Sequence, residues 1–321
     1  MTSPLTIRSL READIPVVCD WARREGFAPG SGDVSIYRQT DRQGLWLGWL
    51  GTEPVGCIAA VRYNAGYGFI GLFLVTAEQR GKGYGLQLWR HAMAHVHDLG
   101  CVGLEAAPDR IRDYAGWGFR PASPTTRWRR AGAGRSEDPG SPGPHCDLPA
   151  ADPARPGARL PEATAASPRS PSRPWCLLEG ASLPQEAVQR FDAQREPSPR
   201  PHFLRQWLRH PAGQVHALVD AQGVCHGFGR IRPCLLQHGE GWRLGPVVAD
   251  DPAAARALVE ALLQRHPGEV LIDAPGANPQ AAPLLAALGF SPVSETLRMY
   301  RGSVPQVSLA DVYGLACLEL G

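Results

Sequence analysis

A glycine-rich turn lies between two apolar stretches and has the residue types and spacing to bind a charged ligand. Residues 69–75 are apolar and strand-like, and the turn after them carries glycine at positions 81, 83 and 85. Leu86, Trp89 and Met93 follow at helical spacing. Closely spaced glycines let successive backbone N–H groups converge on an anion, and a helix N-terminus adds partial positive charge. The turn therefore predicts a phosphate-binding site.

The spacing of the glycines excludes two common phosphate loops. The dinucleotide fingerprint needs G-x-G-x-x-G, whereas this turn reads G-x-G-x-G. The nucleotide-triphosphate loop needs Lys and then Ser or Thr after its last glycine, whereas Gly85 is followed by Leu86 and Gln87. The run from Val75 through Arg80 to Gly85 instead resembles the pyrophosphate-binding motif of the GNAT superfamily, which are acyl-CoA-dependent N-acyltransferases.

This resemblance implies that the chain binds acetyl-CoA, or another short acyl-CoA, as a cosubstrate and needs no metal. The turn would hold the pyrophosphate, and the strand before it would pair with the pantetheine arm. A backbone N–H of that strand would polarise the thioester while an amine attacks directly, without an acyl-enzyme. The expected contacts are Phe73, Leu74, Val75, Arg80, Gly81, Lys82, Gly83, Tyr84, Gly85 and Leu86.

A second signature, Tyr114-x-x-x-Gly118-Phe119, is also similar to a GNAT motif. In that family the tyrosine protonates the departing CoA thiolate, which a phenol can do in a dry cleft. The resemblance therefore implies a catalytic role for Tyr114. The alternative is a half-buried tyrosine whose hydroxyl meets a carbonyl.

The sequence specifies the acceptor-binding residues and the general base less clearly than the acyl-CoA site. The segment 25–30 is similar to a Glu-Gly-Trp-Asn-Pro-Gly run in a group of bacterial and nematode GNAT proteins, which implies that Glu25 and Asp33 contact the acceptor. The alternative is a helix end and a Pro-Gly turn with solvated acids. Glu105, at the end of the predicted fifth strand, is the first candidate for the base. Asp33, Glu25 and a water chain are its rivals.

The order of predicted elements in residues 1–130 is β-α-α-β-β-β-α-β-α-β, which is the GNAT order. Three consecutive strands do not fit an ordinary alternating parallel sheet. The predicted strands span residues 5–10, 45–50, 55–63, 67–75, 102–106 and 121–129, and helices span 11–25, the segment after the glycine turn and 110–116. The first domain, residues 1–130, is therefore expected to be the catalytic acetyltransferase.

Residues 131–174 are expected to be a disordered linker. They hold ten prolines, nine alanines and five glycines, and no Val, Ile, Phe, Tyr or Trp. Such a segment has little apolar surface to offset its ordering entropy.

Residues 175–321 repeat the first order of elements, and resemble the C-terminal GNAT-like domain of the YitH/HolE type. Asp250 and Asp251 stand where the glycine turn would be, and carboxylates at a helix N-terminus repel phosphate. Leu285 replaces the tyrosine. The expected fold class is therefore α/β (α+β): two GNAT folds in tandem, each a mixed, mostly antiparallel splayed sheet flanked by helices, with the second copy degenerate.

Composition narrows the class of partner. A net charge of +2 with 20% charged residues predicts neither a nucleic-acid-binding face nor a membrane-surface patch. The eight cysteines are scattered without C-x-x-C pairs, no apolar N-terminal run predicts a signal peptide, and the apolar stretches are too short for a membrane span. A cytoplasmic protein is expected, and a homodimer stays open.

The predicted function is transfer of an acetyl group from acetyl-CoA to the amine of a small molecule or peptide. The alternative is a non-catalytic acyl-CoA-binding regulatory protein, which would bind CoA but release no thiol when amines are supplied.

Overall fold

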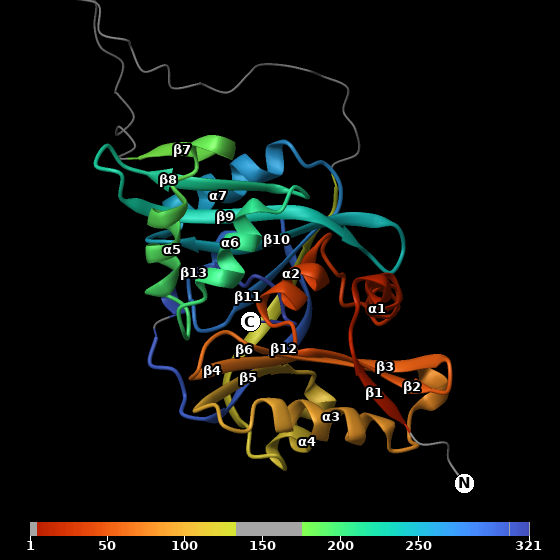
Figure 1. Ribbon diagram of the computed structural model, residues 1–321. Coiled ribbons are helices and arrows are strands. Elements are labelled where there is room, and N and C mark those ends of the chain that lie inside the picture. Colours follow the sequence, from red (N-terminus) through yellow and green to blue (C-terminus); the bar gives the residue numbers. More distant parts are fainter. Residues whose placement is uncertain (1–4, 133–174, 308, 321) are drawn as a thin grey trace, which may run out of the picture.

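Two segments of the chain fold with the same order of elements (Figure 1). The computed structural model describes residues 5–132, 175–307 and 309–320, so the predicted linker lies outside the described residues except for Ala131 and Gly132. The first segment contains β1 (Thr6–Ser9), α1 (Ile15–Arg24), α2 (Asp33–Thr40), β2 (Leu45–Leu50), β3 (Glu53–Arg62), β4 (Tyr67–Val75), α3 (Tyr84–His95), β5 (Cys101–Ala106), α4 (Ile111–Ala115) and β6 (Arg120–Arg130). The second contains β7 (Cys176–Glu179), α5 (Gln185–Ala193), α6 (Pro201–Arg209), β8 (Gln214–Val219), β9 (Cys225–Leu235), β10 (Glu240–Ala249), α7 (Pro252–Gln264), β11 (Val270–Pro275), α8 (Ala281–Ala287), β12 (Ser291–Gly302) and β13 (Val312–Gly314).

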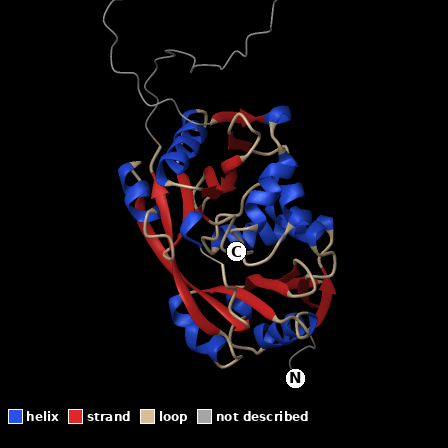
Figure 2. Cartoon of the chain, turned by 90° about the vertical axis from the view of Figure 1, so that its left-hand side faces the viewer, coloured by secondary structure: helices blue, strands red, loops and turns tan. Residues whose placement is uncertain are grey.

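The strands of both segments form one sheet, and the segments exchange their last long strands. The order is β1-β2-β3-β4-β5-β12-β6-β11-β10-β9-β8-β7, with β13 paired to β10. β12 of the second segment pairs with β5 of the first, from Leu297 opposite Ala106 to Gly302 opposite Cys101. β6 of the first pairs with β11 of the second, and β6 and β12 pair with each other. The strands cross between the halves in Figure 2.

Because of this exchange, neither segment forms its part of the sheet from its own strands alone. The strand predicted in residues 121–129 is present as β6, but it does not lie beside β5, the fifth strand of its own segment. Because β12 takes that place, residues 1–130 lack one strand of the sheet on which their own elements pack. The two segments are one hydrogen-bonded unit.

Side chains from both segments also share one hydrophobic core. The helices α1 and α2 cover one face of the first-segment strands, while α3 covers the other (Figure 1). Phe203 and Trp207 of α6 are fully buried against this first face, together with Leu320 near the C-terminus. No helix in the described parts of the chain combines the length and apolar composition needed to cross a membrane.

A buried ion pair joins the segments at the start of α2. Asp33 is 1% exposed, and Arg232 of β9 donates to its two carboxylate oxygens at 2.6 and 2.7 Å. Burial opposes ionisation of Asp33, but the nearby Arg232 charge outweighs it and holds the Asp33 pKa below its ordinary value. This pair closes off the Asp33 carboxylate, and the arrangement argues against the predicted contact between Asp33 and the acceptor.

We expect Asp33→Asn to destabilise the protein by about 3–5 kcal/mol, because it leaves Arg232 buried without its counter-charge. Asp20→Asn is the control, because Asp20 pairs with Arg24 at 2.7 Å but is 46% exposed, and it should cost less than about 1 kcal/mol. Since the Asp33 pKa is lowered on folding, its contribution should be present above the unfolded Asp pKa and decline as the pH falls further. Denaturant unfolding at several pH values measures this. Unchanged stability in Asp33→Asn would contradict the structural role.

A second prediction tests the strand exchange. Residues 1–132 and 175–321, produced together as separate chains, should purify as a one-to-one complex, since β12 and β6 each pair with a strand of the other segment. Produced alone, residues 1–132 should aggregate, because β5 would present a bare strand edge. Size-exclusion chromatography with light scattering measures both. A folded, monomeric first fragment would show that the exchange is not needed.

Candidate active site

The central feature of the site is a bulge in β4. Cys57 pairs with Leu74 and Ala59 pairs with Gly71, so Leu72 and Phe73 together oppose one residue of β3. Leu72 has φ +48°, a backbone conformation that is uncommon for a residue with a side chain. Such a bulge bends its strand and redirects the residues after it.

The bulge separates β4 from β5. These strands run parallel and pair only from Tyr67 to Ile70 on β4 and from Cys101 to Leu104 on β5. Beyond Ile70, no strand of the described residues pairs with this edge of β4. No strand of the described residues covers this edge at positions 73–75, so an extended ligand could pair there.

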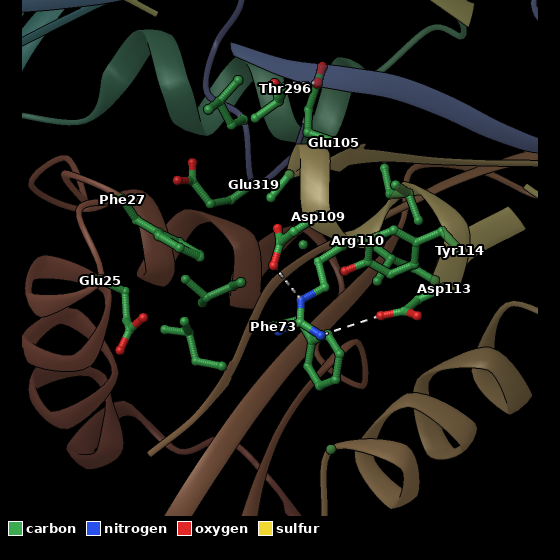
Figure 3. A pocket seen from close by; sticks show the side chains of 18 of the residues that line it. Glu25, Phe27, Phe73, Glu105, Asp109, Arg110, Asp113, Tyr114, Thr296 and Glu319 are labelled. Carbon is green, nitrogen blue, oxygen red and sulfur yellow. Dashed lines mark hydrogen bonds and ion pairs between the residues drawn. The ribbon is translucent and has the colours of Figure 1, made fainter. Parts of the chain in front are cut away.

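A cavity of ≈ 960 Å³ occupies this splay (Figure 3). Most of the residues predicted from the sequence line it, namely Glu25, Phe73, Leu74, Val75, Arg80, Gly81, Gly85, Leu86, Glu105 and Tyr114. Four do not, namely Asp33, Lys82, Gly83 and Tyr84. Tyr84 is buried at the first position of α3, and Lys82 is exposed and donates to Gln79 at 3.0 Å.

The glycine turn has the conformation that the phosphate-site prediction requires. Gly81 and Gly83 have φ of +75° and +82°, which glycine adopts without strain, and a Cβ at either position would meet nothing within 4 Å. Gly83 precedes the first residue of α3, and no side chain caps the helix. The N–H groups of the first helical turn are thus not satisfied by a capping side chain.

Arg80 links the turn to the segment after α1. Its Nε donates to the Val75 carbonyl at 2.9 Å, and its Nη2 donates to Glu25 Oε1 at 2.5 Å. Both side chains are partly exposed at the cavity. Glu25 therefore lines the cavity as the partner of Arg80, and its contact with the acceptor stays a prediction.

Tyr114 enters the cavity from α4 on the side opposite Phe27 (Figure 3). Gly118, with φ +86°, ends the turn after α4, and Phe119 is buried beneath it, so the motif fixes the direction of the tyrosine ring. The ring lies 5.1 Å from Trp89 between ring centroids. Desolvation by these neighbours raises the Tyr114 pKa to about 12, so the phenol keeps its proton at neutral pH.

Glu105 is held by side chains of the exchanged strands. Its Oε1 accepts from Thr125 at 3.0 Å and from Arg298 Nε at 2.6 Å, and its Oε2 accepts from Thr296 at 2.8 Å. A general base needs a free lone pair aimed at the reacting amine. Because three of the roughly four lone-pair positions of the carboxylate already accept hydrogen bonds, this geometry disfavours Glu105 as the base.

Several lining residues were missed by the sequence analysis. Arg127 of β6, and Glu295 and Thr296 of β12, reach the cavity because their strands are exchanged. Leu318 and Glu319 reach it from the C-terminal end of the chain. Nothing in their local sequence marks them, since their position depends on pairing between distant segments.

Arginines of both segments hold the loop at residues 26–28, which borders the cavity. Arg127 Nη1 donates to the Gly26 carbonyl at 2.9 Å, and Arg243 Nη1 donates to the Phe27 carbonyl at 2.7 Å. Asp273 of β11 accepts from both arginines, at 2.7 Å from Arg127 and 2.5 Å from Arg243. The pKa of Asp273 is about 2, because the charges of these two arginines outweigh its burial. The second segment thereby positions residues 26–28.

The equivalent splay in the second segment is filled by the chain itself. β10 and β11 pair in parallel only from Trp242 to Leu244 on β10. Beyond that point β13 pairs with β10 at Val247 and Val248, and Leu315 N–H donates to the Asp273 carbonyl at 2.8 Å.

The second segment also lacks the glycine turn and the tyrosine, the two sequence features that predict acyl-CoA binding and catalysis in the first segment. Asp251 caps α7 by accepting from the Ala254 N–H at 2.8 Å, where the first segment has its glycine turn. Leu285 is fully buried. The second segment therefore has no open splay, no glycine turn and no tyrosine at these positions.

Comparisons with known proteins agree with this architecture. The family model described as "Acetyltransferase (GNAT) family" matches residues 15–119, and the one described as "Acetyltransferase (GNAT) domain" matches residues 188–314. A holothin acyltransferase from Pseudoalteromonas sp. (strain SANK 73390) is 27% identical over 307 residues, which are 95% of this chain and 90% of that protein.

Solved structures share the fold over the full chain. A putative acetyltransferase from Pyrococcus horikoshii has a TM-score of 0.72 at 20% identity, covering 99% of this chain and 96% of its own. A tandem GNAT protein from the clavulanic acid biosynthesis pathway has a TM-score of 0.59 at 16% identity, covering 94% and 100%. With one GNAT model matched to each segment, the chain belongs to the GNAT superfamily and is a tandem GNAT acyltransferase.

Proposed function

We infer that this enzyme transfers a short acyl group, acetyl in the simplest case, from acyl-CoA to the amine of a small molecule. The observation that carries this proposal is the shared cavity: the bulged edge of β4, the glycine turn and Tyr114 all line one space. A bound acyl-CoA would extend from the turn, along β4, to the phenol.

The free groups match the parts of acyl-CoA in order. The N–H groups of residues 81–86 and the α3 dipole would bind the pyrophosphate. The unpaired edge of β4 at Phe73, Leu74 and Val75 would pair with the amides of the pantetheine arm. A β4 N–H near the bulge would then donate to the thioester carbonyl, where negative charge develops as the amine attacks.

Tyr114 has the protonation state required of an acid. A phenol with a pKa near 12 stays protonated throughout the neutral range, and the CoA thiolate formed when the C–S bond breaks would take this proton. The Tyr114 hydroxyl makes no hydrogen bond to another described residue, and burial is the main cause of its raised pKa. This supports the catalytic reading over the structural alternative.

A small-molecule acceptor is favoured by the relative and by the cavity. The relative that matches almost the whole chain is named for acylating holothin. The acceptor side of the cavity is bounded by Phe27, Thr296 and Glu319, and so by three separate parts of the chain.

The first prediction of this proposal is that each chain binds one acyl-CoA, held by the glycine turn. Gly83→Asp should abolish binding, because it adds negative charge where the pyrophosphate would lie. Gly83→Asn is the matched control: Asn has the same shape and also tolerates positive φ, but carries no charge, and it should bind with less than about tenfold loss. Calorimetry with acetyl-CoA measures both. Two sites per chain, or unchanged affinity in Gly83→Asp, would refute the assignment.

The second prediction concerns Tyr114. Tyr114→Phe should lower kcat by roughly ten- to a thousand-fold with little change in acetyl-CoA affinity, because it removes a proton donor and keeps the ring. Tyr313→Phe, which removes a buried phenol in the second segment, is the control and should leave kcat unchanged.

The measurement is CoA-thiol release from acetyl-CoA across a library of primary amines. With its pKa near 12, Tyr114 should cause no alkaline loss of wild-type kcat up to about pH 10. Wild-type turnover in Tyr114→Phe would remove the residue from the mechanism. No thiol release with any amine would favour the non-catalytic alternative.

A further inference from the structure

The C-terminal end of the chain lies directly on the bulged strand of the catalytic segment. A Cβ on Gly71 would come within 2.0 Å of the Glu319 carbonyl oxygen, so only glycine allows this approach. The end is anchored on both sides of this point. Arg232 donates to the Ala316 carbonyl at 3.0 Å, and the Tyr63 hydroxyl donates to the Leu320 carbonyl at 3.0 Å. The backbone of Glu319 is thus fixed against Gly71, the residue that precedes the bulge at Leu72.

The Glu319 carboxylate is buried without a matching donor. The residue is 6% exposed and lines the cavity, and its Oε2 accepts no hydrogen bond from the described residues. Its nearest cation is Arg243, at 3.5 Å, which is beyond a good hydrogen bond and already serves Asp273. A buried carboxylate in this state is destabilising unless something donates to it. A donor from a ligand would supply what the fold does not.

The cavity has excess negative charge. Six carboxylates and three guanidinium groups line it, and each of these arginines is already paired. The pairs are Arg80 with Glu25, Arg110 with Asp109 and Asp113, and Arg127 with Asp273. Arg298, which does not line the cavity, is paired with Glu105, and Arg243 is shared between Asp273 and Glu319. Glu319 is therefore the buried carboxylate whose charge is least compensated.

The position of Glu319 suits the acceptor rather than the acyl donor. In Figure 3 its side chain enters the cavity on the side of Phe27, whereas Tyr114 lies on the opposite side. The turn that would bind the pyrophosphate carries the cations Arg80 and Lys82, whereas Glu319 brings a carboxylate to the side of Phe27. An acidic group would repel the phosphates of CoA and attract a cation.

We propose that Glu319 binds the amino group of a cationic acceptor and accepts a proton from it. This rests on the proposed function and names its substrate class: small primary amines that carry an ammonium charge in solution. The ammonium passes one proton to Glu319, and the freed lone pair forms the C–N bond to the thioester carbon. The C–S bond breaks, and the thiolate takes the Tyr114 proton. The second nitrogen proton, lost as the amide forms, returns to the phenolate through solvent.

The test uses the full chain loaded with CoA, so that no transfer occurs. The probes are phenethylamine, tryptamine and cadaverine, each beside its neutral analogue: 2-phenylethanol, tryptophol and 1,5-pentanediol. Calorimetry should show that wild-type protein prefers at least one ammonium probe over its alcohol. Glu319→Gln should weaken that probe's binding by roughly ten- to a hundredfold, because a charge-assisted hydrogen bond is lost. With acetyl-CoA, KM for the same amine should rise and kcat should fall, because Gln cannot accept the amine's proton, while KM for acetyl-CoA stays constant.

Three further measurements keep the test decisive. Glu319→Asp keeps the charge and should retain part of the binding. Glu240→Gln, at an exposed position at the start of β10, should change nothing. The melting temperature of Glu319→Gln should not fall, because Arg243, the cation 3.5 Å from this carboxylate, keeps Asp273 as its partner, whereas a purely structural Glu319 would lower it.

The failures of the two proposals are distinguishable. If wild-type protein binds acetyl-CoA but none of the ammonium probes, or binds the alcohols equally well, the role of Glu319 is overturned while the proposed function stands. The role of Glu319 is also overturned if Glu319→Gln binds the ammonium probes as tightly as the wild-type protein does. If acetyl-CoA itself does not bind, the proposed function fails first.

Discussion

The pairing of β5 with β12, and of β6 with β11, is the constraint on which the rest of the structure depends. Each segment ends in a strand that its partner segment needs, so neither sheet is complete alone. Strand pairing also brings side chains of one segment into contact with side chains of the other. Arg298 and Thr296 arrive beside Glu105 on β12, and Arg127 arrives beside Asp273 on β6. The exchange therefore determines which charges meet at the cavity, as well as how the sheet is closed.

Much of the acyl-donor half could be predicted from the sequence because its signals are local. Residues 45–50 and 67–75 were predicted as strands and are β2 and β4 with those bounds. The glycine turn depends on φ values that neighbouring residues select, and Tyr114 is oriented by a turn that ends four residues later. Each of these features is set within a few residues of chain, and so a motif is sufficient to place it beside the cavity.

The side of the cavity where we propose that the acceptor binds could not be predicted in the same way, because it is assembled from residues far apart in sequence. Asp33 and Glu319 are both acids with apolar neighbours, yet Asp33 meets Arg232 across the molecule and Glu319 meets an open cavity. Only the exchanged sheet decides between these outcomes. The same is true of Glu105, whose three donors come from Thr125, Thr296 and Arg298. Local sequence identifies these side chains as acids but not which of them is free.

The path of the last residues explains why the second segment has no open splay of its own. β13 fills the splay between β10 and β11, so that segment no longer needs a turn that binds phosphate, and Asp251 can cap α7 instead. The chain leaving β13 then crosses Gly71 and brings Glu319 to the cavity of the first segment. One short stretch thus closes the second cleft and lines the first. A side chain at position 71 would push this stretch off β4, which explains physically why a glycine precedes the bulge. The strands, arginines and C-terminal end of the second segment therefore build part of the wall of the only open splay that the described residues contain, on the side where we propose that the acceptor binds.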